Sequence, residues 1–151
     1  MVKGPINKSK VLDLLADIQI GVDELHSLVA RPSGDFVADR KAYAQAEHYL
    51  RRVLEGILTV GTHLVSRLNG KARDYQEVIV ALGAAGIVTR EFAERNKKLA
   101  GYRNRLVHLY WEVTPEEMFE VISEHLADLA AFIDAFKRTL LTPERFGLFL
   151  E

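Results

Sequence analysis

The sequence contains no cysteine, which excludes disulfide bonds and thiolate chemistry. Nowhere does an apolar run approach the roughly 18 uninterrupted residues that a membrane-spanning helix needs. Residues 1–20 include three lysines and two aspartates, so they lack the continuous apolar core of a signal peptide. From these absences we expect a cytoplasmic protein that does not enter a membrane.

Several motifs that carry chemistry are also missing. The chain has no His-Glu-x-x-His pattern and no cysteine, which argues against a zinc site. Gly83 and Gly86 do not form a phosphate-binding loop, because no Gly-Lys-Ser or Gly-Lys-Thr follows them. The Gly-x-Ser-x-Gly elbow of serine hydrolases is absent as well. We therefore expect neither a metal nor a cofactor.

The length and composition are those of one globular domain. The 151 residues are 48% apolar and 27% charged, which is ordinary for a globular protein with a buried core. We therefore expect residues 1–151 to form a single domain. A net charge of −1 argues against a protein that attracts nucleic acid by its overall field.

Charge is nevertheless distributed unevenly along the chain. Residues 90–105 hold six basic residues and only two acidic ones, whereas residues 112–134 hold seven acidic residues and no basic one. Such runs are most often solvated helix faces. The alternative is a local basic site for phosphate beside an acidic surface for a protein partner.

The spacing of apolar residues predicts an all-α bundle of about five helices, because apolar side chains recur at three- and four-residue steps. The expected helices are 9–30, 38–68, 74–85, one that follows the N-cap Thr89, and one that follows the capping box at Thr114 and extends to Leu140. No strand-like alternation stands out. Long helices with wide apolar stripes on a small chain favour a homodimer. The segment 31–37 and the tail 141–151 have no assigned role.

The segment 101–111 concentrates unusual chemistry. It contains Arg103, Asn104, Arg105, His108, Tyr110 and Trp111. On an unbroken helix, the five-residue step from Arg103 to His108 is a rotation of about 140°, so the two side chains would face different ways. We therefore expect either that the helix ends near His108 or that a second copy of the chain completes the site.

An arginine and a histidine beside one phosphate can cleave RNA without a metal. Histidine titrates near neutrality and can move the proton of the ribose 2′-hydroxyl. Arginine is always charged and can hold two phosphate oxygens. Asn104 could hold His108 or a ribose, and Tyr110 and Trp111 could stack a base. The basic side chains of Lys97, Lys98 and Arg105 are further candidates for RNA binding.

The run from Arg103 to Tyr110 resembles the Arg-x4-His-x-Tyr signature of the HepT family, HEPN-domain ribonuclease toxins of toxin–antitoxin pairs. Further similarity lies in Ala81–Val88, in the long second helix and in the Val113-Thr114-Pro115 helix start. It covers roughly residues 8–140, which we expect to form a HEPN-like core.

The resemblance implies a role for each motif residue. It makes Arg103 and His108 a metal-independent catalytic pair at a cleft between two protomers, with Asn104 in support. It makes Tyr110 the residue to which a partner nucleotidyltransferase antitoxin, MntA, adds AMP, thereby silencing the toxin. The implied substrate is RNA, either tRNA or mRNA.

Two alternatives to the toxin hypothesis remain open. One is a non-catalytic HEPN subunit that partners a nucleotidyltransferase, for which the acidic last helix is a candidate protein-binding surface. A purely structural helical dimer leaves the Arg-Asn-His-Tyr set unexplained. The stripe of His48, Arg52, Glu55, Thr59 and His63 is expected to be an exposed helix face, the alternative being a lining of the RNA cleft. His125 is expected to be a hydrogen-bonded core residue.

Overall fold

A computed structural model describes residues 4–108 and 112–151 of the chain. In the described residues, the elements are β1 (Gly4–Ile6), α1 (Lys8–Val29), α2 (Ser33–Ala38), α3 (Arg40–Arg67), α4 (Tyr75–Ala84), α5 (Arg90–Asn96), α6 (Leu99–Val107), α7 (Pro115–Leu141), the 3-10 helix η1 (Pro143–Phe146) and β2 (Leu148–Leu150). The predicted all-α architecture is confirmed. No helix in these residues is both long and apolar enough to cross a membrane.

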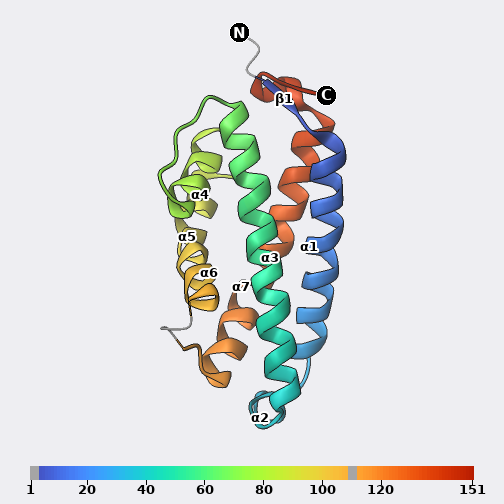
Figure 1. Ribbon diagram of the computed structural model, residues 1–151, viewed down its shortest axis with the longest axis vertical. Coiled ribbons are helices and arrows are strands. Elements are labelled where there is room, and N and C mark those ends of the chain that lie inside the picture. The colour runs from blue at the N-terminus through green and yellow to red at the C-terminus, as the bar shows by residue number, and fades with distance from the viewer. Residues whose placement is uncertain (1–3, 109–111) are drawn as a thin grey trace.

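Three long helices, α1, α3 and α7, form the body of the molecule (Figure 1). Their buried faces carry the aliphatic and phenylalanine side chains that the three- and four-residue spacing predicted. Leu54, Ile57 and Phe132 are at most 2% exposed and lie in one continuous core. Hydrophobic burial along these helices therefore supplies most of the fold's stability.

Two glycines let α1 and α3 approach closely. A Cβ atom on Gly21 would lie 2.5 Å from Val53 Cγ2, and one on Gly56 would lie 2.5 Å from Ile18 Cγ1. Each helix thus places a branched side chain over a glycine of the other. The close contact of the two helices depends on glycine having no Cβ atom, because the interior has no spare volume for another methyl group.

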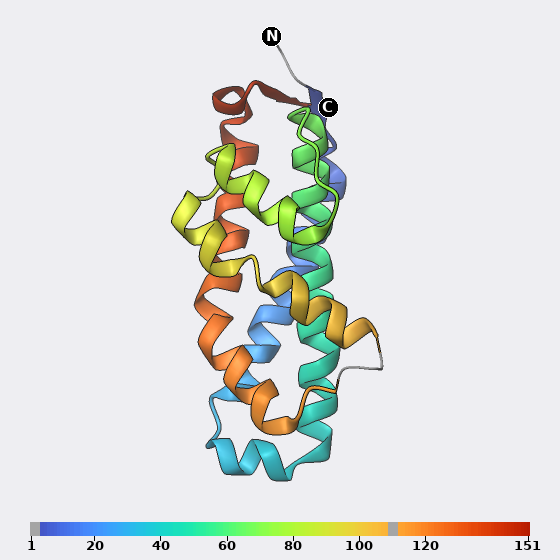
Figure 2. The same cartoon turned by 90° about the vertical axis from the view of Figure 1, so that its left-hand side faces the viewer.

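The short helices α4, α5 and α6 form a second layer that crosses the face of α3 and α7 (Figure 2). Asp74 and Thr89 cap the first two of these helices by accepting hydrogen bonds from the backbone N–H groups of Glu77 and Phe92. The ring of Phe92 in α5 packs on Phe132 of α7 with centroids 4.8 Å apart. The layer places the end of α6 beside the middle of α3.

The helix expected to follow Thr89 is divided in two, α5 and α6. Asn96 is fully buried, and its side-chain amide donates a 3.0 Å hydrogen bond to the carbonyl of Phe92. This side-chain hydrogen bond competes with the main-chain hydrogen bonds of the helix at the point where α5 ends. The turn at residues 97–98 then redirects the chain, so the motif lies on a helix of its own.

Two more elements differ from expectation. The break predicted after Arg31 contains the six-residue helix α2, whose Phe36 is fully buried. The unassigned tail provides β2, which pairs in parallel with β1 and brings Ile6 opposite Leu150. A strand of three residues is too short to show an alternation of apolar and polar side chains. Each of these two strands forms by pairing with the other and not through its local sequence.

Candidate functional site

The motif helix α6 ends at His108. His108 has an extended backbone, with φ −96° and ψ 116°, and its N–H donates to the carbonyl of Asn104 at 2.9 Å. The helix end predicted near His108 is therefore confirmed. Its imidazole is exposed, so it is accessible to a bound substrate.

Arg103 is held from three sides by residues of α3, α4 and α6. Its Nε donates to Glu55 Oε1 at 3.0 Å, and its Nη1 donates to Asn104 Oδ1 at 3.1 Å. The guanidinium carbon lies 4.9 Å from the centre of the Tyr75 ring. The side chain is 20% exposed. The guanidinium is thus fixed in place by an ion pair, an amide and an aromatic face.

This arrangement leaves part of the guanidinium available to a ligand. An arginine has five N–H donors, and within the described residues two of these are engaged. A pocket of about 360 Å³ adjoins the side chain. Residues of α3, α4 and α6 and of the loop before α4 line it: Thr62, Ala72, Arg73, Asp74, Tyr75, Val78, Arg103 and Asn104. The pocket is large enough for a phosphate and its sugar.

Asn104 connects the two halves of the candidate site. Its side-chain oxygen accepts from Arg103, while its main-chain carbonyl accepts from the N–H of His108. No hydrogen bond joins Arg103 directly to His108 in the parts of the chain that the structure describes. The two side chains are therefore linked through the helix end rather than through mutual contact.

Arg105 anchors the chain that follows the site. Its guanidinium donates to both carboxylate oxygens of Glu117, at 2.5 and 2.8 Å, and to the carbonyl of Glu112 at 2.8 Å. The side-chain hydrogen bonds between Arg105 and Glu117 lower the pKa of Glu117 and raise the pKa of Arg105. The hydroxyl of Tyr43 donates to the carbonyl of Val113. These contacts tie the start of α7 to α3 and α6.

Tyr110 and Trp111, expected to carry the AMP group and to contact RNA, lie outside the described residues. The other RNA-binding candidates are described. Lys97 Nζ lies 2.5 Å from Glu94, and Lys98 Nζ lies 3.4 Å from Glu124. The lysine side chains are 36% and 52% exposed, so solvent weakens both ion pairs and a phosphate can compete for the ammonium groups.

The basic and acidic runs of the sequence face each other across α5, α6 and α7. Arg95 pairs with Asp128 at 3.1 Å, Lys98 with Glu124 and Arg105 with Glu117. Neither of the sequence-based interpretations, two solvated faces or a basic site beside a partner surface, included this intramolecular pairing. Part of the acidic face of α7 is therefore engaged within the chain.

The polar stripe on α3 does not form one surface with a single role. His48 is exposed as expected, but Glu55 faces α6 and holds Arg103. His63 is half-buried and accepts a 3.1 Å hydrogen bond from the N–H of Asn7, and burial lowers its pKa. The residues of the stripe therefore lie in three different environments: solvent, the contact with Arg103 and the contact with Asn7.

His125 is buried as predicted, but the expectation that it is hydrogen-bonded is wrong for the described residues. Neither ring nitrogen has a hydrogen-bond partner in them. Its side chain is 3% exposed, and burial lowers its pKa, so the neutral imidazole is favoured. Tyr102 of α6 lies over it with ring centroids 6.2 Å apart.

Sequence reasoning did not name Tyr75, and it placed Glu55 in the site only through the less favoured alternative that the polar stripe lines the RNA cleft. Glu55 is 48 positions before Arg103, and nothing in the local sequence pairs them. The available signal was a carboxylate within the polar stripe of a long helix, but such residues are usually solvated. The contact depends on how α6 crosses α3.

Comparisons with known proteins identify the family. The family described as Ribonuclease HepT-like matches residues 18–136. The chain is 28% identical over 111 residues to the tRNA nuclease HepT of Aphanizomenon flos-aquae, covering 73% of this chain and 76% of that protein. It is 27% identical over 89 residues to the mRNA nuclease HepT of Shewanella oneidensis, covering 58% and 67%. The chain belongs to the HepT-like ribonuclease family.

The fold agrees with this assignment. A solved structure of the tri-AMPylated HEPN toxin of Shewanella oneidensis in complex with MNT antitoxin superposes with a TM-score of 0.75. The alignment covers 85% of this chain and 96% of that one at 22% identity. The resemblance to HEPN proteins noted in the sequence is confirmed at the level of family and fold.

Proposed function

We propose that this protein is a metal-independent endoribonuclease toxin in which Arg103 and His108 act on one RNA phosphodiester at a cleft between two protomers. The observation that carries the proposal is the fixed guanidinium of Arg103, which adjoins a pocket and belongs to the same short helix that ends at the exposed His108. The HepT nucleases among its relatives support RNA as the substrate.

Arg103 serves as the phosphate clamp. Glu55 and Asn104 hold the guanidinium in one orientation, so less conformational freedom is lost when it binds an anion. Its remaining donors are positioned to stabilise the charge that develops on phosphorus oxygens during cleavage. Glu55 acts through Arg103 and is a positioning residue.

His108 supplies the proton transfers. A neutral imidazole removes the proton from a ribose 2′-hydroxyl, the 2′-oxygen attacks phosphorus, and the bond from phosphorus to the 5′-oxygen breaks. A protonated imidazole donates a proton to the departing 5′-oxygen. The products are a 2′,3′-cyclic phosphate and a 5′-hydroxyl, and the reaction requires no metal. In a homodimer, His108 from the second protomer can supply the other proton transfer.

A nucleotidyltransferase antitoxin of the MntA type is the proposed partner. The related Shewanella toxin is described as AMPylated and bound to its MNT antitoxin. On this chain the proposed target is Tyr110, two positions after His108. An AMP group there would place bulk and negative charge next to the position of the RNA phosphate and so block cleavage.

The test is cleavage of tRNA and total RNA by unmodified protein in the presence of EDTA. We expect cyclic phosphate ends, and a loss of roughly 100- to 10,000-fold in rate for His108→Ala and Arg103→Ala. His26→Ala changes another exposed histidine, and Arg95→Ala removes another ion-paired arginine, so both should cleave normally. Intact mass establishes the absence of an adduct on Tyr110.

The alternative, a non-catalytic partner subunit, makes the opposite prediction. Its motivation was the acidic last helix, but Glu117, Glu124 and Asp128 of that helix are engaged in ion pairs within the chain. Unmodified protein that leaves all RNA intact, and whose expression without the antitoxin does not arrest growth, would favour the binding subunit.

A further inference from the structure

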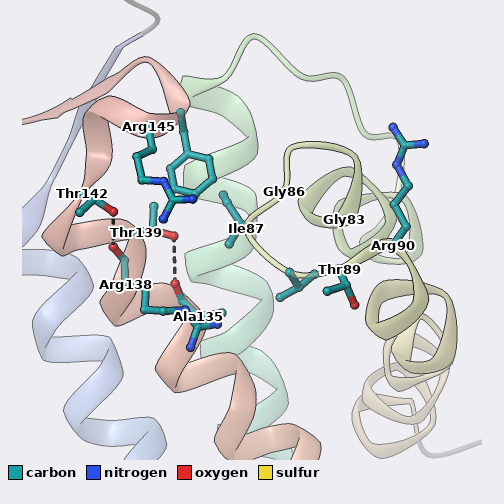
Figure 3. Close-up of a pocket in the computed structure, with 12 residues that line it drawn as sticks. Gly83, Gly86, Ile87, Thr89, Arg90, Ala135, Arg138, Thr139, Thr142 and Arg145 are labelled. Atoms are coloured by element: carbon teal, nitrogen blue, oxygen red, sulfur yellow. Dashed lines mark hydrogen bonds between the residues drawn. The ribbon is translucent and has the colours of Figure 1, made fainter.

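A second pocket lies away from the candidate site, between the connection from α4 to α5 and the end of α7 (Figure 3). Its volume is about 420 Å³. Residues from these two segments and from η1 line it: Gly83, Gly86, Ile87, Val88, Thr89, Arg90, Ala135, Arg138, Thr139, Thr142, Arg145 and Phe146. None of the residues that Arg103 contacts belongs to it.

The lining of this pocket is cationic without a compensating carboxylate. Arg138 and Arg145 come from the end of α7 and from η1, and neither forms an ion pair within residues 4–108 and 112–151. By contrast, three other pockets each have at least one carboxylate in their lining, namely Asp39, Asp74 or Glu55. Two uncompensated guanidinium groups favour an anion.

The side chains around the two arginines suit more than a bare ion. Figure 3 shows Arg138 and Arg145 on the same side of the pocket as Thr139, with Arg90 directed away from them. Ala135, Ile87 and Phe146 add an apolar surface that fits a ribose or a base.

We propose that this pocket binds a nucleotide of the RNA substrate at a distance from the bond that is cut, with Arg138 and Arg145 holding its phosphate. The inference rests on the proposed ribonuclease function. The pocket lies near the end of α7 that adjoins η1, whereas α6, which ends just before His108, contacts the start of α7 through the ion pair of Arg105 with Glu117. An RNA that occupies both must extend along the short-helix layer. The pocket therefore selects long or folded RNA over short oligonucleotides.

The test compares two neighbouring positions on α7. Fluorescein-labelled tRNA is titrated with His108→Ala protein that carries either Arg138→Glu or Lys137→Glu. Both changes reverse one exposed charge, but Lys137 does not line the pocket. We expect Arg138→Glu to weaken binding about 10-fold or more near 0.1 M salt and to lower the salt-dependence slope by about 1. Lys137→Glu should weaken binding less than about 3-fold.

Cleavage kinetics provide the second measurement. In otherwise wild-type protein, Arg145→Glu should raise KM for tRNA while kcat stays unchanged, and it should leave cleavage of a dinucleotide unaffected. Equal effects of Arg138→Glu and Lys137→Glu on tRNA binding would overturn the inference. AMP binding that is lost in Arg138→Glu while tRNA binding persists would assign the pocket to a free nucleotide and also overturn it.

The two proposals fail separately. Binding is measured on His108→Ala protein and requires no cleavage, so an inactive wild-type protein contradicts the ribonuclease proposal alone. A protein that cleaves tRNA but shows the same tRNA affinity in all pocket variants contradicts this inference and leaves the ribonuclease proposal intact.

Discussion

The body of α1, α3 and α7 and the layer of α4, α5 and α6 share one apolar core but differ in the polar contacts added to it. In the body, Leu54, Phe132 and their neighbours bury apolar surface almost completely. The short-helix layer adds exposed and half-exposed ion pairs to α3 and α7, such as Arg95 with Asp128 and Arg105 with Glu117. Solvent screens such exposed ion pairs, so each adds little to stability, whereas a buried core side chain adds much more.

The difference shows where the fold places the two residues that we propose act on RNA. Arg103 and His108 lie on the layer with the polar contacts, at a helix end next to a rigid apolar body. Charged groups there can be positioned precisely enough for catalysis without being required for folding. Three consecutive residues of α3 allow this comparison to be tested. Leu54 lies in the apolar core, Glu55 pairs with Arg103 of the short-helix layer, and Gly56 lies against Ile18 of α1.

Leu54→Ala should have the largest effect on stability. Leu54 is 1% exposed within the core, so the substitution leaves a cavity and is expected to lower the free energy of unfolding by about 2–5 kcal/mol. Urea unfolding followed by circular dichroism measures this loss. The folded fraction should cleave RNA at the normal kcat, and a selective loss of kcat in folded protein would contradict the separation of the two regions.

Glu55→Gln should act mainly on activity. The amide removes the negative charge beside the Arg103 guanidinium, so the clamp is positioned less firmly. We expect kcat for RNA cleavage to fall about 10-fold, which is about 1.4 kcal/mol, with unfolding free energy changed by less than about 1 kcal/mol.

The matched control is Glu94→Gln, which removes the same charge from the exposed ion pair with Lys97. It should leave kcat within about twofold of wild type, because this ion pair is screened by solvent. Equal kcat losses in the two variants would show that Glu55 has no particular role in positioning Arg103.

Gly56→Ala probes the close contact of α1 and α3. The new Cβ would lie 2.5 Å from Ile18 Cγ1, and overpacking of this kind costs about 1–3 kcal/mol. Alanine regains up to about 1 kcal/mol of helix propensity, so a net loss of about 1 kcal/mol is expected. Thermal unfolding measures it, and Gly34→Ala, with nothing within 4 Å, is the control. An unchanged Gly56→Ala melt would contradict close packing at this point.

The smallest expected effect concerns pH. Burial lowers the folded-state pKa of His63, so protonation favours the unfolded chain. The contribution of neutral His63 to the free energy of unfolding is therefore present above about pH 6.5 and is lost as the pH falls through the folded-state pKa. His125 contributes with the same sign. His63→Gln should therefore make unfolding free energy fall less steeply between pH 7.5 and 5.5. An identical slope in the variant would show that His63 does not contribute.

Sequence patterns predicted the parts of the fold that depend on neighbouring residues. The apolar spacing located α1 and α3, and the Thr114 cap located the start of α7, where its hydroxyl accepts from the N–H of Glu117. The helix end at His108 was one of two alternatives that followed from requiring Arg103 and His108 to act together, the other being a site completed by a second copy of the chain. The division of α5 from α6 was missed, because it depends on the buried contact of the Asn96 side chain.

The candidate site was predictable in its residues and unpredictable in its contacts. Arg103, Asn104 and His108 were identified from residue chemistry and family resemblance, and their roles remain predictions. The partner of Arg103 was not identified, because Glu55 belongs to another helix. The acidic and basic runs also gave no indication that Lys98 and Glu124 lie within 3.4 Å of each other.

By itself, the sequence determined the helical class of this protein, the caps that begin its helices and the groups available for chemistry, since these follow from short-range spacing and side-chain type. Tertiary structure alone decided that Glu55 meets Arg103, that β1 pairs with β2, and that Arg138 and Arg145 share a pocket. The physical reason is that such contacts depend on how complete helices pack, which no local pattern encodes.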